Sequence, residues 1–144
     1  MTRGLHTEIV PVEEVPLEDK RLPGIDVLVV DDEQVIADTL TVILSRSGYS
    51  VLSAYDGKTA LKIASENPPA LLISDVVMPG MTGVELALSL RHSNPECRIL
   101  LFSGQAATAD LLEKARALGH DFTILSKPVH PRDLIRRVTE YLRS

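Results

Sequence analysis

Length, composition and charge narrow the possible functions before any motif is considered. The chain has 144 residues, of which 44% are hydrophobic and 24% are charged, as in a single globular domain. A net charge of −5 argues against direct binding to nucleic acid or to an anionic membrane, and a single cysteine excludes internal disulfides and multi-cysteine metal sites. The N-terminus lacks the apolar core of a signal peptide and no apolar run reaches the ~20 residues that span a bilayer, so we expect a cytoplasmic protein.

Residues 1–22 differ from the remainder of the chain. They contain Pro11, Pro16 and no sustained hydrophobic period, so we expect a flexible N-terminal arm followed by one domain over residues 23–144. Four apolar residues of the arm would allow a short extended piece to pack on the domain: Val10, Val12, Val15 and Leu17.

Beyond the arm, five short apolar runs alternate with five helical patterns. The predicted strands are 25–30, 50–54, 70–74, 98–102 and 122–126. The predicted helices are 33–47, 57–66, 83–92, 106–118 and 131–143. Because strands that are apolar almost throughout are buried on both faces, we predict an α/β fold with a five-stranded parallel sheet, helices on both faces and right-handed connections.

Polar residues follow the strands. Asp31 and Asp32 follow the first strand, Asp75 the third, Ser103 the fourth and Lys127 the fifth. Because ligands of open α/β sheets bind at the carboxyl ends of strands, we expect these side chains to converge. Three neighbouring carboxylates repel one another, and a hard divalent cation such as Mg²⁺ relieves that repulsion. A carboxylate, a metal, a lysine and a hydroxyl are the parts needed to accept a phosphoryl group.

Four motifs at these strand ends carry a resemblance to a known family: VVDDE (29–33), SDVVMPGMTG (74–83), LFSG (101–104) and SKP (126–128). Over about residues 24–143 the chain resembles the receiver domain of bacterial two-component response regulators. The resemblance implies a flavodoxin-like (βα)5 fold with strand order 2-1-3-4-5. It also implies a phosphoacceptor signalling module, not a turnover enzyme, that takes a phosphoryl group from phosphohistidine and changes its partner-binding surface.

The resemblance assigns roles to the acidic residues. Asp75 resembles the phosphoacceptor of the family, and Asp31 and Asp32 resemble the acidic pair that holds Mg²⁺ together with it. Val77, two residues after Asp75, resembles the position that offers the metal only its backbone carbonyl. The implied metal site therefore consists of three carboxylates and one main-chain oxygen.

The remaining motifs resemble the parts that respond to the phosphoryl group. Ser103 resembles the hydroxyl that bonds the phosphoryl oxygens, and Lys127 resembles the lysine that pairs with them. Pro128 implies the cis Lys–Pro bond that is usual in the family. Gly80 and Gly83 are expected to give the backbone conformational freedom in the loop beside the acceptor.

Two features depart from the family pattern. Ile124 stands where the family carries an aromatic residue three positions before the lysine, and the nearest aromatic is Phe122. The segment 119–127 also looks one residue longer than usual, which favours a bulge or an altered register in the fifth strand. Val77 is apolar where some receivers carry a polar residue that helps water attack the phosphate. Gln105 stands two residues after Ser103, and the sequence does not decide which residue positions that water.

The resemblance implies a sensor histidine kinase or a histidine phosphotransfer protein as phosphodonor, and a downstream protein partner that the sequence does not identify. After residue 143 there is no length for a DNA-binding unit, so we expect either a free-standing receiver or the receiver piece of a longer protein, and Met1 and the tail favour the former. An alternative is a pseudo-receiver, in which the same fold binds a protein partner constitutively without phosphoryl transfer. Ile124 favours that alternative, whereas the intact aspartates and Lys127 oppose it. An aspartate-based phosphohydrolase would need a second acid at position 77, where the chain has valine.

Overall fold

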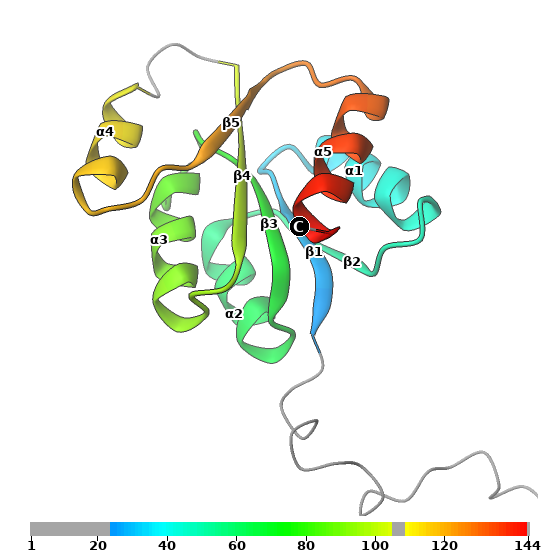
Figure 1. The fold of residues 1–144 in the computed structure, drawn as a ribbon, viewed down its shortest axis with the longest axis horizontal. Coiled ribbons are helices and arrows are strands. Elements are labelled where there is room, and N and C mark those ends of the chain that lie inside the picture. Colours follow the sequence, from blue (N-terminus) through cyan, green and yellow to red (C-terminus); the bar gives the residue numbers. More distant parts are fainter. Residues whose placement is uncertain (1–23, 105–108, 144) are drawn as a thin grey trace, which may run out of the picture.

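The computed structural model describes residues 24–104 and 109–143, which contain five strands and five helices (Figure 1). The strands are β1 (Ile25–Val30), β2 (Val51–Ala54), β3 (Pro69–Asp75), β4 (Arg98–Ser103) and β5 (Thr123–Ser126). The helices are α1 (Gln34–Arg46), α2 (Gly57–Glu66), α3 (Gly83–Ser93), α4 (Ala109–Ala117) and α5 (Pro131–Arg143). Each element lies within a residue or a few residues of its predicted range.

Two of the sequence expectations fall on residues that lie outside the described ranges. The predicted arm over 1–22 is one, and residues 106–108, at the start of the fourth predicted helix, are the other. Within the described part of the chain, none of the helices combines the length and the apolar character needed to cross a membrane.

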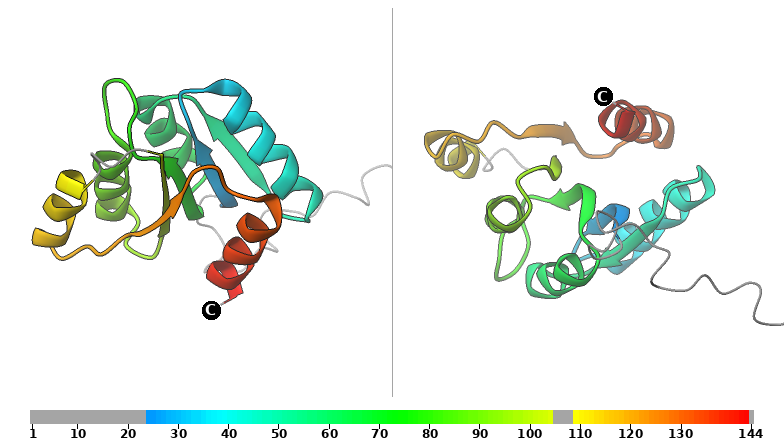
Figure 2. Two further views of the ribbon diagram at one scale, coloured as in Figure 1. Left: turned by 90° about the horizontal axis from the view of Figure 1, so that it is seen from above. Right: turned by 60° about the horizontal axis from the view of Figure 1, so that its bottom comes forward.

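The five strands form one parallel sheet in the order β2-β1-β3-β4-β5. This order confirms the predicted flavodoxin-like (βα)5 architecture. Two of the helices, α1 and α5, pack on one face of the sheet, and α2, α3 and α4 pack on the other. Figure 1 shows the two groups on opposite sides of the central strands, and the two views of Figure 2 show the same division from other directions.

Alternating side chains of the central strands explain the two faces. In β1, Val27 and Val29 enter the core beneath α1 and α5, whereas Leu28 and Val30 enter the core beneath α2, α3 and α4. All four of these side chains are at most 1% exposed. These four residues are apolar because both faces of the strand are covered, as expected for a parallel sheet with helices on each side.

Helix starts at the carboxyl edge of the sheet are fixed by local capping. Thr82 and Glu85 form a capping box at the start of α3, in which the Glu85 N–H donates to Thr82 Oγ1 at 3.1 Å and the Thr82 N–H donates to Glu85 Oε1 at 2.9 Å. Asp56 caps α2 by accepting the Thr59 N–H at 2.7 Å. These caps end the loops after β2 and β3 at defined residues, which holds the β3–α3 loop beside Asp75.

Candidate functional site

The polar residues predicted at the strand ends lie together at the carboxyl edge of the sheet. Asp75 and Ser103 are the last residues of β3 and β4, and Asp31 and Lys127 directly follow β1 and β5. Lys127 Nζ lies 3.1 Å from Asp31 Oδ2 and 3.3 Å from Asp75 Oδ2. One ammonium group therefore bridges two carboxylates that come from neighbouring strands.

Asp31, Asp32 and Asp75 form an acidic cluster in which carboxylate oxygens of all three residues lie within 4.8 Å of one another. Asp31 is 1% exposed, and its Oδ1 accepts the Glu33 N–H at 3.0 Å, so this carboxylate is held in one orientation. Asp32 is exposed to solvent. Three carboxylates at this spacing, one of them open to water, fit a hard divalent cation such as Mg²⁺, which takes oxygen ligands and keeps several waters.

The charges in the cluster do not balance. Burial raises the pKa of the Asp75 carboxyl above its ordinary value; the charge of Lys127 opposes that shift, and the charges of Asp31 and Asp32 add to it. Burial lowers the pKa of Lys127, but the hydrogen bond to Asp31 and the charges of Asp31 and Asp75 outweigh burial, and the net pKa lies above the ordinary value. The lysine is thus held in its charged form, and it only partly compensates the three acids around it.

Lys127 is positioned by the pairing of β5 with β4. Ser103 pairs with Ser126 in the parallel register, and the backbone N–H of Lys127 donates to the Ser103 carbonyl at 3.0 Å. Ser103 is 9% exposed, which places it at the end of β4 with little access to solvent. The Lys127–Pro128 peptide bond is cis, as the resemblance implied. The serine and the lysine are therefore adjacent in the sheet although they come from different motifs of the sequence.

The loop after Asp75 packs against the backbone of β3. A Cβ atom at Gly83 would lie 2.1 Å from the carbonyl oxygen of Asp75, so no larger residue fits there. The Gly83 N–H also donates to the Val76 carbonyl at 2.8 Å. Gly83 is therefore required because a larger residue would not fit, and not because of its backbone conformation. Gly80 has a φ of +75°, so the conformational freedom expected of glycine is needed there.

The structure adds a contact at Ser74 that sequence reasoning missed, and it places Val77. The Ser74 hydroxyl donates to the Asp75 carbonyl at 2.9 Å, although Ser74 is fully buried and the sequence marks it only as part of a strand. Val77 is 41% exposed two residues beyond Asp75, and its role as a carbonyl ligand remains a prediction. Gln105 lies outside the described residues.

The bulge predicted in the fifth strand does not occur within the paired residues. Strand β5 pairs with β4 in unbroken register from Thr123 to Ser126, and Phe122 directly precedes the strand. Phe122, at that point, is 8% exposed and lies in the core beneath α2, α3 and α4. The Arg91 guanidinium lies 5.6 Å from the centroid of its ring, and the His120 ring stacks on it at 5.7 Å. Phe122 is therefore an internal anchor of the turn, and Ile124 is only partly buried.

Comparison with known proteins gives a consistent result. A family model for the response regulator receiver domain matches residues 27–139. The response regulator receiver protein CpdR of Brucella abortus is 34% identical over 116 residues, which cover 81% of this chain and 95% of CpdR. The probable transcriptional regulatory protein TcrX of Mycobacterium tuberculosis is 32% identical over 119 residues, 83% of this chain and 50% of TcrX. The chain thus spans about half the length of TcrX.

Solved structures agree with the sequence comparison. The crystal structure of a CheY-like response regulator receiver domain protein from Methanospirillum hungatei superposes with a TM-score of 0.75 at 29% identity. The match covers 85% of this chain and 94% of that protein. The similarity therefore extends over nearly the whole domain and includes every strand end that contributes to the acidic cluster.

Proposed function

The chain belongs to the response regulator receiver domain family, and from this premise we propose that it accepts a phosphoryl group from phosphohistidine onto Asp75. Receiver domains of two-component systems are signalling modules and not turnover enzymes. The observation that carries the proposal is the position of Lys127, within 3.3 Å of the acceptor carboxylate and 3.1 Å of Asp31. A cation fixed beside a carboxylate at an open strand edge is suited to neutralise incoming phosphoryl oxygens.

The transfer would proceed by attack of an Asp75 carboxylate oxygen on phosphorus. A bond forms between that oxygen and phosphorus while the bond from phosphorus to the imidazole nitrogen of the donor breaks, and the imidazole leaves with the electron pair and takes up a proton. Mg²⁺, when bound, would supply charge neutralisation at the phosphoryl oxygens. Asp31, Asp32 and Asp75 would hold it, together with the backbone carbonyl of Val77.

Ser103 and Lys127 would respond to the new group. A phosphoryl group adds a charge of about −1.5 to −2 and three acceptor oxygens, which attract an ammonium and a hydroxyl donor. Both residues lie at the end of adjacent strands, and both are linked through the Lys127 N–H and the Ser103 carbonyl. Movement of one toward the phosphoryl group would therefore displace the end of β5 as well, which changes the surface presented to a downstream partner.

The partners that follow are a sensor histidine kinase or a histidine phosphotransfer protein as donor, and a downstream protein as target. The net charge of −5 supports protein contacts and no direct binding to nucleic acid or to an anionic membrane. We place the module in the cytoplasm, where an unpaired cysteine such as Cys97 stays reduced. The identities of the kinase and the target are left to a phosphotransfer screen.

The proposal is tested by incubating the protein with Mg²⁺ and a small phosphodonor such as acetyl phosphate, followed by intact-mass spectrometry. The wild-type chain should gain the mass of one phosphoryl group, and Asp75→Asn should gain none. Asp56→Asn is the matched control, because it removes an acid outside the cluster and asparagine caps a helix as well as aspartate does. Labelling that persists in Asp75→Asn would show that the acceptor is a different residue.

The pseudo-receiver alternative predicts the opposite result for the wild-type chain. It would bind its partner with the same affinity before and after exposure to the phosphodonor, and no mass would be gained at any Mg²⁺ concentration. The acidic cluster and the bridging lysine support the phosphoacceptor over this alternative, because a constitutive binding module has no use for three carboxylates within 4.8 Å of one another.

A further inference from the structure

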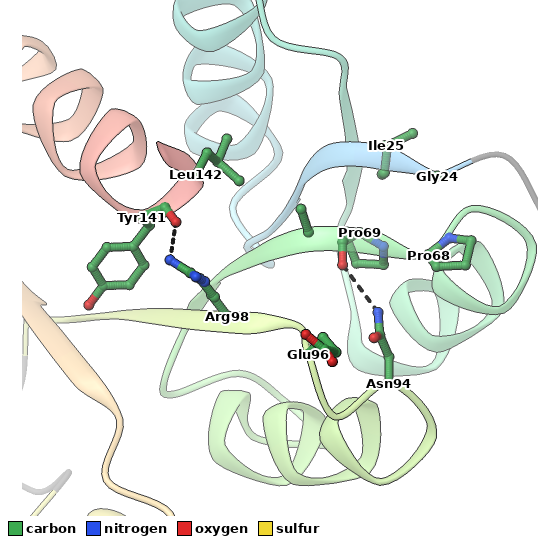
Figure 3. A pocket seen from close by; sticks show the side chains of 10 residues that line it. Gly24, Ile25, Pro68, Pro69, Asn94, Glu96, Arg98, Tyr141 and Leu142 are labelled. Atoms are coloured by element: carbon green, nitrogen blue, oxygen red, sulfur yellow. Dashed lines mark hydrogen bonds between the residues drawn. The ribbon is translucent and has the colours of Figure 1, made fainter. Parts of the chain in front are cut away.

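An apolar groove lies at the opposite edge of the sheet from the acidic cluster, where the strands begin (Figure 3). It has a volume of about 940 Å³ and is bounded by the starts of β1 and β3, the turn between α3 and β4, and the end of α5. Most of its surface is apolar and comes from Ile25, Pro68, Pro69, Ala70, Tyr141 and Leu142. An apolar surface of this kind is a site where a further chain segment can bind.

Hydrogen bonds within the domain fix the walls of the groove. The Asn94 side-chain amide donates to the Pro69 carbonyl at 3.2 Å, which joins the end of α3 to the start of β3. The Arg98 guanidinium donates to the Tyr141 carbonyl, which joins β4 to the end of α5. Figure 3 shows both bonds at the rim. Because these walls are held by bonds that the domain makes internally, the groove exists before anything binds in it, and binding needs little rearrangement.

The chain enters the domain at this groove. Gly24 lines the groove and lies very close to Pro68. A Cβ atom at Gly24 would lie 2.7 Å from the Pro68 carbonyl oxygen. The next residue, Ile25, donates its N–H to the same carbonyl at 3.1 Å. The point from which residues 1–23 lead away is therefore fixed in the groove itself, and those residues lie outside the described part of the chain.

The sequence just before Gly24 has the composition of an occupant for such a groove. Residues 10–17 read VPVEEVPL, with four large apolar residues and two prolines. Proline favours the extended polyproline conformation, which lowers the entropy lost on binding.

The tether is short enough to favour binding within one molecule. Leu17 lies seven residues before Gly24, so it can reach about 25 Å from that point when the intervening chain is extended. A connection of this length gives an effective concentration on the order of 1 mM. Binding that is weak between separate molecules therefore suffices to keep the segment in place.

We propose that residues 10–17 bind in this groove as an intramolecular strap, with their apolar side chains against Ile25, Pro69 and Leu142. The strap covers the end of the domain where the strands begin and lies away from the acidic cluster. The proposal stands on the groove and the tether, so it is independent of the role assigned to Asp75. It also gives the acidic N-terminal segment a position of its own on the domain.

Limited proteolysis of the full chain with a glutamyl endopeptidase tests the strap, because Glu13, Glu14 and Glu18 lie in or beside it. If separate segments would bind with a dissociation constant on the order of 0.1 mM, the tether leaves about one molecule in ten open. Cleavage at these sites should then be roughly tenfold slower than in a synthetic peptide of residues 8–22. Equal rates in the chain and in the peptide would overturn the proposal.

Substitutions on both partners locate the binding site. Val15→Asp combined with Leu17→Asp should restore the cleavage rate to that of a peptide carrying the same substitutions. Ala70→Arg should do the same from the groove, because Ala70 is exposed and arginine there fills the groove without disturbing the core. Leu118→Arg is the control, since Leu118 is 66% exposed and lies outside the groove. Slow cleavage that survives Ala70→Arg would place the segment elsewhere, against the proposal.

The concentration dependence of cleavage separates a strap from an exchange between two copies. Protection within one molecule does not change with protein concentration, whereas protection by a second copy falls as the protein is diluted. A protection factor that stays constant over a roughly hundredfold dilution supports the strap. A factor that falls toward one on dilution would show that the segment binds a neighbouring molecule, and the intramolecular proposal would be wrong.

Discussion

Asp31 and Asp75 lie on one region of the domain and Lys127 lies on another. The two regions differ in how deeply their side chains are buried. The aspartate half, β1 and β3, positions Asp31 and Asp75, and most of its residues are buried. The lysine half, α4 and β5, positions Lys127 and is only lightly covered: no side chain of β5 is fully buried, and among the described residues of α4 only Ala115 is. Displacement of the lysine half therefore costs less free energy, and we expect charge added at Asp75 to move that half first.

The largest difference is expected between core truncations in the two halves. Leu72→Ala removes a fully buried side chain of β3 and should lower the free energy of unfolding by about 3–4 kcal/mol, through lost burial and the cavity left behind. Ile124→Ala removes a partly buried side chain of β5 that packs on the same core and should cost about 1–2 kcal/mol. Urea unfolding of both variants measures the contrast, and equal losses would show that the two halves are equally buried.

Alanine substitutions at two glycines should differ in their effect on stability. Gly83→Ala brings a Cβ within 2.1 Å of the Asp75 carbonyl oxygen and should destabilise the domain by about 3 kcal/mol, because backbone must shift. Gly104→Ala, at the end of β4 beside Lys127, brings its Cβ no closer than 3.6 Å to that side chain. It should leave stability within about 0.5 kcal/mol of wild type. Thermal melts followed by circular dichroism measure the stability of both variants. Equal stability of Gly83→Ala and Gly104→Ala would contradict this prediction.

Removing the charge of Asp75 should stabilise the fold. Because the folded-state pKa of Asp75 is raised, chiefly by burial, the protonated form adds stability at pH values below the ordinary pKa of 3.8, and that stability is lost as the pH rises through the folded-state pKa. Asp75→Asn should therefore melt about 2–5 °C above wild type at neutral pH. The advantage should disappear below pH 3.8. Calorimetric melts across this range measure it, and an advantage that grows on acidification would reverse the sign assigned here.

The smallest effect is expected from ion pairs on the surface of the lysine half. Arg116 and Glu113 form a pair at 3.2 Å along α4, with side chains that are 55% and 68% exposed. Solvent screens such a pair, so Glu113→Gln should change the melting temperature by no more than about 1–2 °C, and less at high salt. A larger change that persists in high salt would show that α4 depends on this pair more than its exposure allows.

The sequence predicts most of the fold and the location of the site. Continuous apolar strands indicate a sheet covered on both faces, and polar residues after several strands indicate one edge, because parallel strands end on the same side. Asp31, Asp75 and Lys127 lie where that reasoning placed them. Their roles in phosphoryl transfer rest on family membership and on the experiments above.

What sequence reasoning missed depends on contacts between segments that are distant along the chain. Nothing local to Phe122 indicates that Arg91 of α3 would lie over its ring. The bulge expected in the fifth strand was wrong because β5 pairs with β4 in unbroken register from Thr123 to Ser126. The space requirement at Gly83 likewise follows from the approach of α3 to the Asp75 carbonyl, which only the packed fold determines.

The excess of acids over the single ammonium at this site has a consequence for the order in which reactants arrive. With Asp31, Asp32, Asp75 and Lys127 all ionised, the cluster carries three negative charges and one positive charge, a formal charge of −2. Such a field attracts small cations and repels anions, and a phosphodonor is an anion. We therefore expect the divalent ion to bind first. The anionic phosphodonor would bind after the ion has neutralised the negative charge of the cluster.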